Sequence, residues 1–194
     1  RNSTQPISWK MKHCLLMAAL LVSFTVTRAQ INIRPYAAVG YGLENQIGFR
    51  GMTLQGELAF GFTDHIEGIV HMNYFFSNNV PKWDKSMNEG AYYHQVTSAI
   101  KALYHTREDG NGLLLSGGLA FRSGKTNHFL TGDLHDGVFT NNRYITDELR
   151  GKGLVAGIGY GFNITSSLNA RVEINHYAFT ALNDMQTLTL KIGF

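Results

Sequence analysis

The sequence predicts an all-β protein, an eight-stranded antiparallel up-and-down barrel that spans a membrane, and three observations lead to this prediction. Eight segments of strand character follow one another along the chain, each long enough to cross a bilayer when tilted, which takes about 9 to 11 residues. The connections between these segments alternate between short and long. Within the segments apolar and polar side chains alternate with a period of two, which indicates strands with one apolar face.

The eight predicted strands are rich in aromatic and β-branched residues, and none shows a sustained helical period. They are Ile31–Gly42, Met52–Phe62, Ile66–Ser77, Ala91–His105, Leu113–Arg122, Gly153–Phe162, Leu168–Phe179 and Met185–Phe194. Pro35 is disfavoured inside the first predicted strand, because proline has no N–H to donate to a neighbouring strand. It predicts either a bulge or a later start for that strand.

The last strand shows the alternation most clearly. One face carries Leu188, Leu190, Ile192 and Phe194, and the other carries Thr187, Thr189, Lys191 and Gly193. A strand of this kind has one side suited to lipid or a core and the other suited to a polar environment.

The beginning of the chain is predicted to lie outside the barrel. Residues 11–29 have the positive start, apolar core and small-residue cleavage site of a secretory signal peptide, which would be cut before Gln30. The apolar core, Cys14–Val26, is too short for a membrane-spanning helix, which needs about 20 residues. Residues 1–10 are set aside as an upstream segment, so that one barrel domain is expected over residues 30–194.

The basic charge of the chain belongs to this leader. The full sequence has 17 basic and 14 acidic residues, a formal net charge of +3, but removing the leader leaves 13 basic residues against 14 acidic ones. That balance gives no support to a nucleic-acid partner. The only cysteine, Cys14, also lies in the leader, so no disulfide is expected in the mature chain.

The polar faces of the strands carry charges of both signs. Since an eight-stranded barrel is just wide enough inside to be filled by its own side chains, these residues are predicted to form a paired network in the lumen. The predicted members are Arg34, Glu57, Glu67, Lys101, Arg122, Arg171, Glu173 and Lys191. The favoured interpretation is structural, and the alternative is a narrow pore or small-solute transporter gated by these charges.

Aromatic residues on the apolar faces favour a membrane barrel over a soluble one whose apolar face points inward. They fall into two sets at opposite strand ends, as expected for two bilayer interfaces. The periplasmic set is Phe60, Phe62, Tyr104, Tyr160, Phe162 and Phe194, and the external set is Tyr41, Tyr74, Phe76, Tyr92 and Phe121.

The leader, the eight segments, the unequal loops and Phe194 together resemble the small outer-membrane barrels of the outer membrane protein A and X type. The resemblance covers residues 30–194 as a pattern and includes no peptidoglycan-binding domain. It implies a location in the bacterial outer membrane, with short turns in the periplasm and longer loops outside. It also implies that the closing strand, through Leu188, Leu190, Ile192 and Phe194, is the signal that the barrel-assembly machinery recognises.

His176 is the most suggestive candidate for catalysis. Its position in the alternating pattern places it on the lipid-facing side of its strand, near the external rim. Some eight-stranded barrels are lipid A deacylases, which carry a histidine and, two residues later, a serine on that surface. Here the second position holds Ala178, and no partner acid is visible in the sequence. Because a serine hydrolase needs its hydroxyl as acyl acceptor, the protein is predicted not to be an enzyme, with a lipid A-modifying enzyme as a distant alternative.

The two longest predicted loops, 78–90 and 123–152, are expected outside the cell. The longer one contains His128, Asp133, His135 and Asp136, but their spacing matches no tight ligand pattern, so neither a metal nor another cofactor is predicted. Aromatic residues interleaved in both loops favour contact with a partner, or else packing on one another as a cap.

These observations predict an integral outer-membrane protein that acts through its external loops in surface recognition, adhesion or envelope integrity. The expected partners are outer-membrane lipid and lipopolysaccharide, the barrel-assembly machinery, and an extracellular ligand bound by loops 78–90 and 123–152. No nucleic-acid partner is expected.

Overall fold

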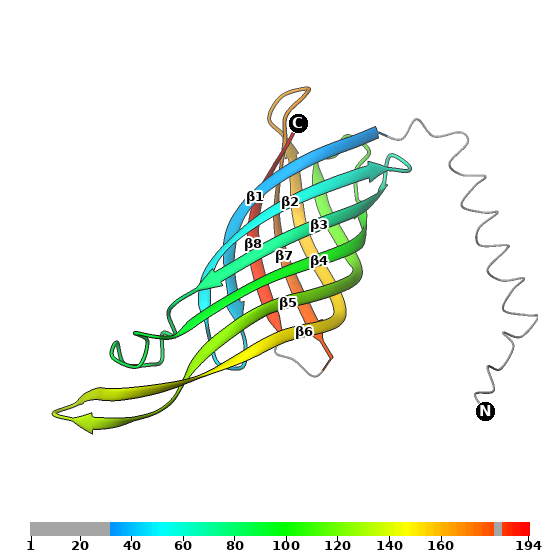
Figure 1. The fold of residues 1–194 in the computed structure, drawn as a ribbon. Coiled ribbons are helices and arrows are strands. Elements are labelled where there is room, and N and C mark those ends of the chain that lie inside the picture. Colours follow the sequence, from blue (N-terminus) through cyan, green and yellow to red (C-terminus); the bar gives the residue numbers. More distant parts are fainter. Residues whose placement is uncertain (1–31, 181–183) are drawn as a thin grey trace, which may run out of the picture.

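The computed structural model describes residues 32–180 and 184–194, which form one closed antiparallel β-barrel (Figure 1). Its strands are β1 (Asn32–Glu44), β2 (Arg50–Gly61), β3 (Ile66–Ser77), β4 (Tyr92–His105), β5 (Gly112–His135), β6 (Val138–Asn163), β7 (Asn169–Phe179) and β8 (Met185–Gly193). The predicted fold class is therefore confirmed. The predicted upstream segment and signal peptide lie outside the described residues. Within the described part of the chain, no helix has the length and hydropathy to cross a membrane.

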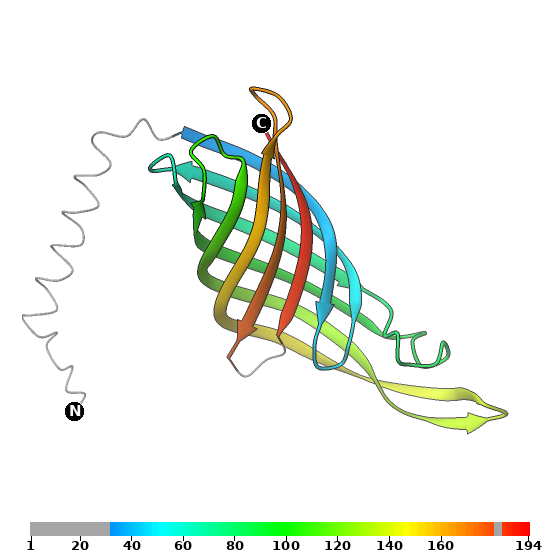
Figure 2. The ribbon, with the colours of Figure 1, turned by 180° about the vertical axis from the view of Figure 1, so that it is seen from behind.

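Each strand pairs with the next one along the chain, and β1 and β8 close the ring. Figure 2 shows β8 lying between β7 and β1. The closing register runs from Tyr36 opposite Gly193 to Glu44 opposite Met185. The start of β1 and the C-terminus lie at the barrel end that carries the short turns (Figure 1), which is the periplasmic end in barrels of this kind.

Pro35 marks neither a bulge nor a later strand start, so that prediction is wrong. It lies within β1 opposite Leu58 of β2, in an uninterrupted register. Its carbonyl accepts a hydrogen bond from the N–H of Phe194 (3.2 Å), just beyond the end of β8. Since the nitrogen and carbonyl of a strand residue point to the same neighbour, the missing N–H of Pro35 faces Phe194, beyond the paired positions that begin with Tyr36 and Gly193. The proline therefore interrupts none of the paired positions of β1 and β8 from Tyr36 to Glu44.

The predicted loop 123–152 is wrong, because most of these residues continue β5 and β6 as a long hairpin. His135 and Val138 pair directly and are joined by the two-residue turn Asp136-Gly137. Both turn residues have positive φ, 48° and 80°, the conformation of a type I′ hairpin turn. Outside the membrane nothing requires these strands to alternate apolar and polar residues. The alternation that predicts a strand is therefore absent from the part of the hairpin that lies outside the bilayer.

The two surfaces of the barrel wall differ as predicted. Every strand carries exposed apolar side chains on its outward face, among them Val39, Leu54, Val70, Ile100, Leu119, Ile158, Ile174 and Leu190. Most inward side chains are buried, and many of them are polar or charged. A water-soluble barrel would bury its apolar face, so this distribution is that of a barrel surrounded by lipid.

Candidate functional site

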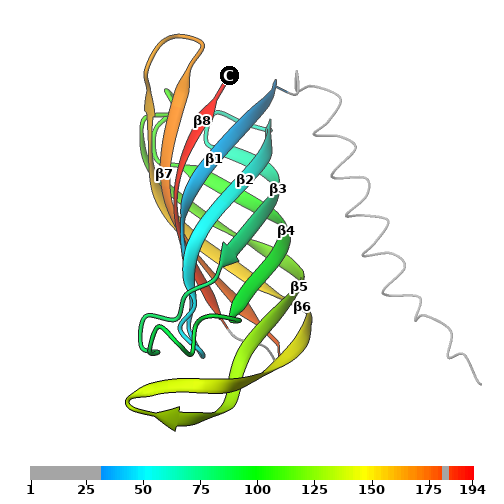
Figure 3. The same ribbon diagram turned by 60° about the vertical axis from the view of Figure 1, so that its left-hand side comes forward.

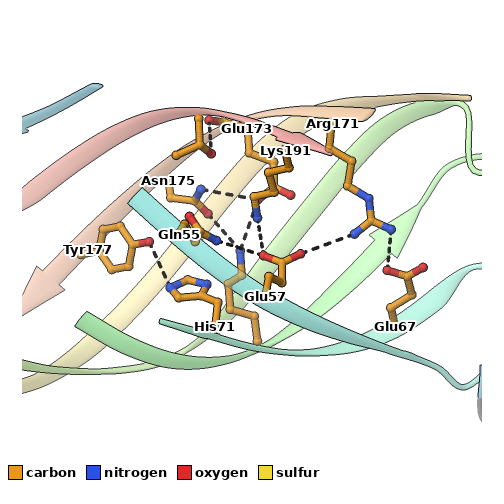
Figure 4. Close-up of polar contacts among 11 residues, drawn as sticks. Gln55, Glu57, Glu67, His71, Arg171, Glu173, Asn175, Tyr177 and Lys191 are labelled. Carbon is orange, nitrogen blue, oxygen red and sulfur yellow. Dashed lines mark hydrogen bonds and ion pairs between the residues drawn. The ribbon is translucent and has the colours of Figure 1, made fainter. Parts of the chain in front are cut away.

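The centre of the lumen holds a connected group of charged side chains (Figure 4). Six of the eight predicted residues meet there, three acids and three bases, which we call the lumen network: Glu57, Glu67, Lys101, Arg171, Glu173 and Lys191. They come from β2, β3, β4, β7 and β8, because alternate residues of each strand point inward. The equal number of acids and bases leaves the group formally neutral.

The bonds of the lumen network form a continuous chain. Lys191 Nζ donates to Glu57 and, at 2.9 Å, to Glu173 Oε2. Lys101 Nζ donates to the same Glu173 oxygen (3.2 Å) and to Asn175 Oδ1 (3.2 Å). Arg171 Nη2 donates to Glu67 Oε2 (2.7 Å), and its Nη1 lies 3.7 Å from Glu57 Oε1.

These charges are removed from solvent, which makes their pairing necessary. The side chains of Lys101 and Lys191 are fully buried, and that of Glu173 is 1% exposed. A buried charge without a partner costs several kcal/mol, and each member of the network has at least one partner of opposite sign.

The other two predicted members lie apart from this group. Arg34 has the inward parity but is at the periplasmic mouth, where it lines a cavity. Arg122 is toward the external end, where Nη1 donates to Tyr93 Oη (3.1 Å) and the guanidinium lies 4.3 Å from the centre of the Phe179 ring. The alternation of side chains along a strand predicts which face a residue lies on, and both residues do face the lumen. It does not predict how far along the barrel axis a residue lies.

Several lumen residues were missed because the sequence search followed charge alone. His71 Nε2 is hydrogen-bonded to Tyr177 Oη (3.2 Å), and Gln55 Nε2 donates to Glu57 Oε2 (3.0 Å). His105 Nε2 lies 3.3 Å from Glu67 Oε1. All these residues have inward parity, so an inspection of every polar residue at inward positions would have found them.

Interior glycines make room for this polar filling. A Cβ placed on Gly157 would lie 2.5 Å from Asn175 Oδ1 and 2.6 Å from Ser116 Oγ. A Cβ on Gly159 would lie 2.7 Å from Glu173 Cγ. The glycines of β6 therefore leave space for side chains of the neighbouring strands β5 and β7.

The two ends of the lumen are unlike each other. The periplasmic mouth is a polar cavity of about 340 Å³, lined by residues that include Arg34, Glu67, His105 and Arg171. The external end is filled by rings: Phe49, Phe75 and Tyr93 are fully buried, and the ring of Tyr93 has its centre 5.4 Å from that of each phenylalanine. The lumen network is thus shielded from the outside by an aromatic layer and approached from the periplasm by a polar cavity.

The 78–90 loop and the 128–145 hairpin lie against each other beyond this aromatic layer (Figure 3). We call them together the external cap. Rings join the two parts, since Phe129 lies between Trp83 and Tyr144 at centroid distances of 6.2 and 6.1 Å. Trp83 also contacts Phe49 at 6.2 Å, which connects the cap to the lumen.

Hydrogen bonds fix the same contact between loop and hairpin. Asn142 Nδ2 donates to the carbonyl of Ser86 (2.7 Å), and Tyr144 Oη donates to that of Met87 (3.1 Å). Inside the loop, the hydroxyl and N–H of Ser86 donate to Asp84 Oδ1 (2.5 and 2.8 Å). These two bonds hold the pKa of the Asp84 carboxyl below its usual value.

The residues considered for metal binding and catalysis do not form such sites. Asp133 Oδ2 accepts a hydrogen bond from Asn141 (2.9 Å), and nowhere in the described part of the chain do three histidine, cysteine or acidic side chains converge as a metal site requires. His176 does have an acid partner that the sequence did not reveal, since its Nε2 lies 3.5 Å from Asp184 Oδ2. The position two residues later, Ala178, still offers no hydroxyl.

Comparisons with known proteins return similar folds among solved structures alone. No protein-family model matches the sequence, and no curated protein matches it significantly. Among solved structures, the N-terminal β-barrel domain of Pseudomonas aeruginosa OprF has 17% identity and a TM-score of 0.47, covering 84% of this chain and 98% of that one. Neisserial surface protein A has 10% identity and a TM-score of 0.48, covering 83% and 94%. The attachment invasion locus protein Ail of Yersinia pestis, in complex with the heparin analogue sucrose octasulfate, has 13% identity and a TM-score of 0.49, covering 84% and 97%.

The cellular location of the protein follows from the architecture of its barrel. An even number of antiparallel strands, an apolar belt outside and a polar interior are the architecture of bacterial outer-membrane proteins. The protein is an integral outer-membrane β-barrel. Similarity at the identities given above assigns it neither a ligand nor an activity.

Proposed function

We propose that this outer-membrane barrel is not an enzyme, that its filled lumen is structural, and that it acts through the external cap in surface recognition or adhesion. The observation that carries the proposal is the 128–145 hairpin, which is held against the 78–90 loop by rings and hydrogen bonds. A surface fixed in this way loses little conformational entropy when it binds a partner.

The hairpin also offers the chemistry of a protein-binding surface. Leu130, Leu134 and Val138 are 60%, 63% and 51% exposed. Among the residues that the structure describes, the two hairpin strands pair beyond the barrel only with each other, because β4 accompanies β5 only as far as Asn127 and β7 accompanies β6 only from Gly153. One group of the outer edge is already bonded, since the N–H of Phe139 donates to Ser86 Oγ of the 78–90 loop (3.0 Å). Exposed apolar side chains beside unpaired strand edges favour an extended protein segment as the partner.

Two further partners belong to this proposal. Outer-membrane lipid and lipopolysaccharide would surround the apolar wall. The barrel-assembly machinery would recognise β8 and the terminal residue, whose outward side chains include Leu188, Leu190 and Phe194 at 51%, 46% and 69% exposure.

Trimming the hairpin tests the recognition role. Asn127 and Thr146 are cross-strand partners, so residues 128–145 can be replaced by an Asn-Gly turn without altering the barrel. Bacteria displaying the wild-type protein are expected to adhere to at least one of immobilised fibronectin, laminin and type IV collagen, and bacteria displaying the trimmed protein at equal surface density are not. Equal adhesion by both strains, or none by the wild type on any of the three, would refute the proposal.

Planar-bilayer recording tests the filled lumen against the pore alternative. Fully buried Lys101, Lys191 and Tyr93 occupy the path, so the folded protein is expected to give no resolved single-channel openings. Regular openings that change in size when Lys191 is replaced by Met would support a pore gated by the lumen network.

A further inference from the structure

On three adjacent strands the apolar belt of the outer wall ends before the strand reaches the external end of the barrel. On β4 the exposed Ile100 and Val96 are followed toward the outside by His94. On β5 Phe121 is followed by Ser123 and Lys125, and on β6 Leu154 gives way to Lys152 and Arg150. This boundary is where the hydrocarbon of the outer leaflet ends and its head groups begin.

The wall is hollowed at this boundary. A depression of about 410 Å³ has Tyr74, Tyr92 and Val96 at its apolar side and Lys125, Glu148 and Arg150 at its polar side. We call it the rim hollow. Cross-strand pairing brings these residues together, because His94 is opposite Lys125, Lys125 is opposite Glu148, and Ser123 is opposite Arg150.

The aromatic side of the rim hollow is ordered by contacts. Tyr74 Oη is hydrogen-bonded to His94 Nδ1 (2.8 Å), and Tyr92 packs edge-on against the imidazole with centroids 5.4 Å apart. Tyr74 also stacks on Phe76 at 5.7 Å. Rings that are apolar on one side and polar at the tip suit the junction between acyl chains and head groups.

The charge of this region is positive overall. Arg150 Nη2 donates to Glu148 Oε2 at 3.3 Å, which uses part of the guanidinium. Lys125 and Lys152 have no ion-pair partner among residues 32–180 and 184–194. This stretch of the outer wall therefore carries three cations and one carboxylate.

We propose that the rim hollow binds the phosphorylated head group of lipid A in the outer leaflet. The ammonium of Lys125 and the guanidinium of Arg150 are the groups that bind phosphate, and the rings with Val96 accommodate the adjoining acyl chain. This inference depends on the outer-membrane location and is independent of the role of the external cap.

The test uses the folded mature protein in detergent, and the probes are lipid A species with identical acyl chains and two, one or no phosphates. Binding is measured by native mass spectrometry. The double variant Lys125→Gln/Arg150→Gln is expected to lose roughly 30-fold in affinity for bisphosphorylated lipid A, since each basic group near an anionic surface contributes roughly five-fold. Lys82→Gln/Lys85→Gln removes the same charge from the external cap and should change the affinity by less than about two-fold.

The variant Glu148→Gln is expected to change the affinity for lipid A in the opposite direction. Removing this carboxylate should strengthen binding by roughly five-fold, because it releases Arg150 and removes repulsion of the phosphate. The proposal is overturned if lipid A without phosphate binds as tightly as the bisphosphorylated form, if the Lys125/Arg150 variant binds like wild type, or if the Lys82/Lys85 control loses as much. All these positions are exposed, and gel mobility before and after boiling verifies that each variant is folded.

Discussion

At the scale of single residues, the lumen network shows how a barrel this narrow holds charges. Glu173 Oε2 accepts bonds from both Lys101 and Lys191, and Glu57 is bonded to Lys191 and lies near Arg171. Each carboxylate is therefore shared between two cations. Such an arrangement adds little net stability over an apolar core, but it makes every member dependent on the others.

Replacing Lys191 by Met should lower the free energy of unfolding by about 3–5 kcal/mol, because it leaves Glu57 and Glu173 buried with too few cations. The double variant Lys191→Met/Glu57→Gln should be less affected than the sum of the single variants, by about 0.5–3 kcal/mol. Urea unfolding in lipid vesicles measures both. Arg150→Gln is the control, since its exposed pair with Glu148 contributes about 0–1 kcal/mol. Equal losses for Lys191 and Arg150 would contradict a buried network.

Leu190 tests the outer face in the same way. It is 46% exposed on the lipid side of β8, so Leu190→Arg should lower the free energy of unfolding in vesicles by about 2–4 kcal/mol. Gln186 has the same outward parity but lies at the external end of the strand, and Gln186→Arg should cost only about 0–1 kcal/mol. A larger cost at Gln186 than at Leu190 would mean that the bilayer lies elsewhere on the barrel.

At the scale of elements, the sequence predicted the strands well where the membrane constrains them. The eight strands, their inward and outward faces and the bounds of β3 were all predictable, because lipid demands an apolar residue at every second position. The hairpin beyond the barrel has no such constraint, and polar residues such as Asp133 and Asn141 resemble those of a loop. The signal that could have revealed it is Asp136-Gly137, a dipeptide typical of tight hairpin turns.

The contacts within the site were less predictable than the strands. Parity assigned Arg34 and Arg122 to the lumen, but their distance from the network depends on strand tilt and register. The bond between His176 and Asp184 was hidden for a similar reason, because it joins the end of β7 to the start of β8. Contacts of this kind depend on the register between neighbouring strands, which the sequence of a single strand does not contain.

The external cap has a built-in probe, since Trp83 is the only tryptophan after Gln30. Phe129 packs against it at 6.2 Å, so Phe129→Ala should detach the hairpin from the 78–90 loop and shift the emission of Trp83 to longer wavelength. Limited proteolysis should then cut residues 78–90 or 128–145 sooner. Leu134→Ala, at a position 63% exposed, is the control and should change neither measurement. An unchanged emission spectrum for Phe129→Ala would show that the cap does not depend on this contact.

At the scale of the whole molecule, closure of the ring pairs every strand of the wall on both sides. Such a barrel resists detergent until it is heated, so the unboiled protein should migrate differently from the boiled protein on a detergent gel. Gly40→Leu provides a sensitive variant, because a Cβ at Gly40 would collide with the Leu188 carbonyl across the β1–β8 seam. Gly56→Leu, at an outward position with open space, should retain the wild-type shift. If the two variants showed the same gel mobility before and after boiling, the pairing of β1 with β8 at Gly40 would be contradicted.

The length of the β5–β6 hairpin has a consequence for the order in which the barrel forms. Its turn joins neighbours in sequence, His135 and Val138, whereas the β1–β8 seam joins Tyr36 to Gly193 from opposite ends of the chain. Local pairings close small loops and form quickly, and distant ones pay a larger entropic cost and form late. Pairing of consecutive strands, the β5–β6 hairpin among them, is therefore expected to precede closure of the seam. On this account substitutions at tight turns such as Asp136-Gly137 would change the rate of insertion, and substitutions at the seam would change the lifetime of the inserted state.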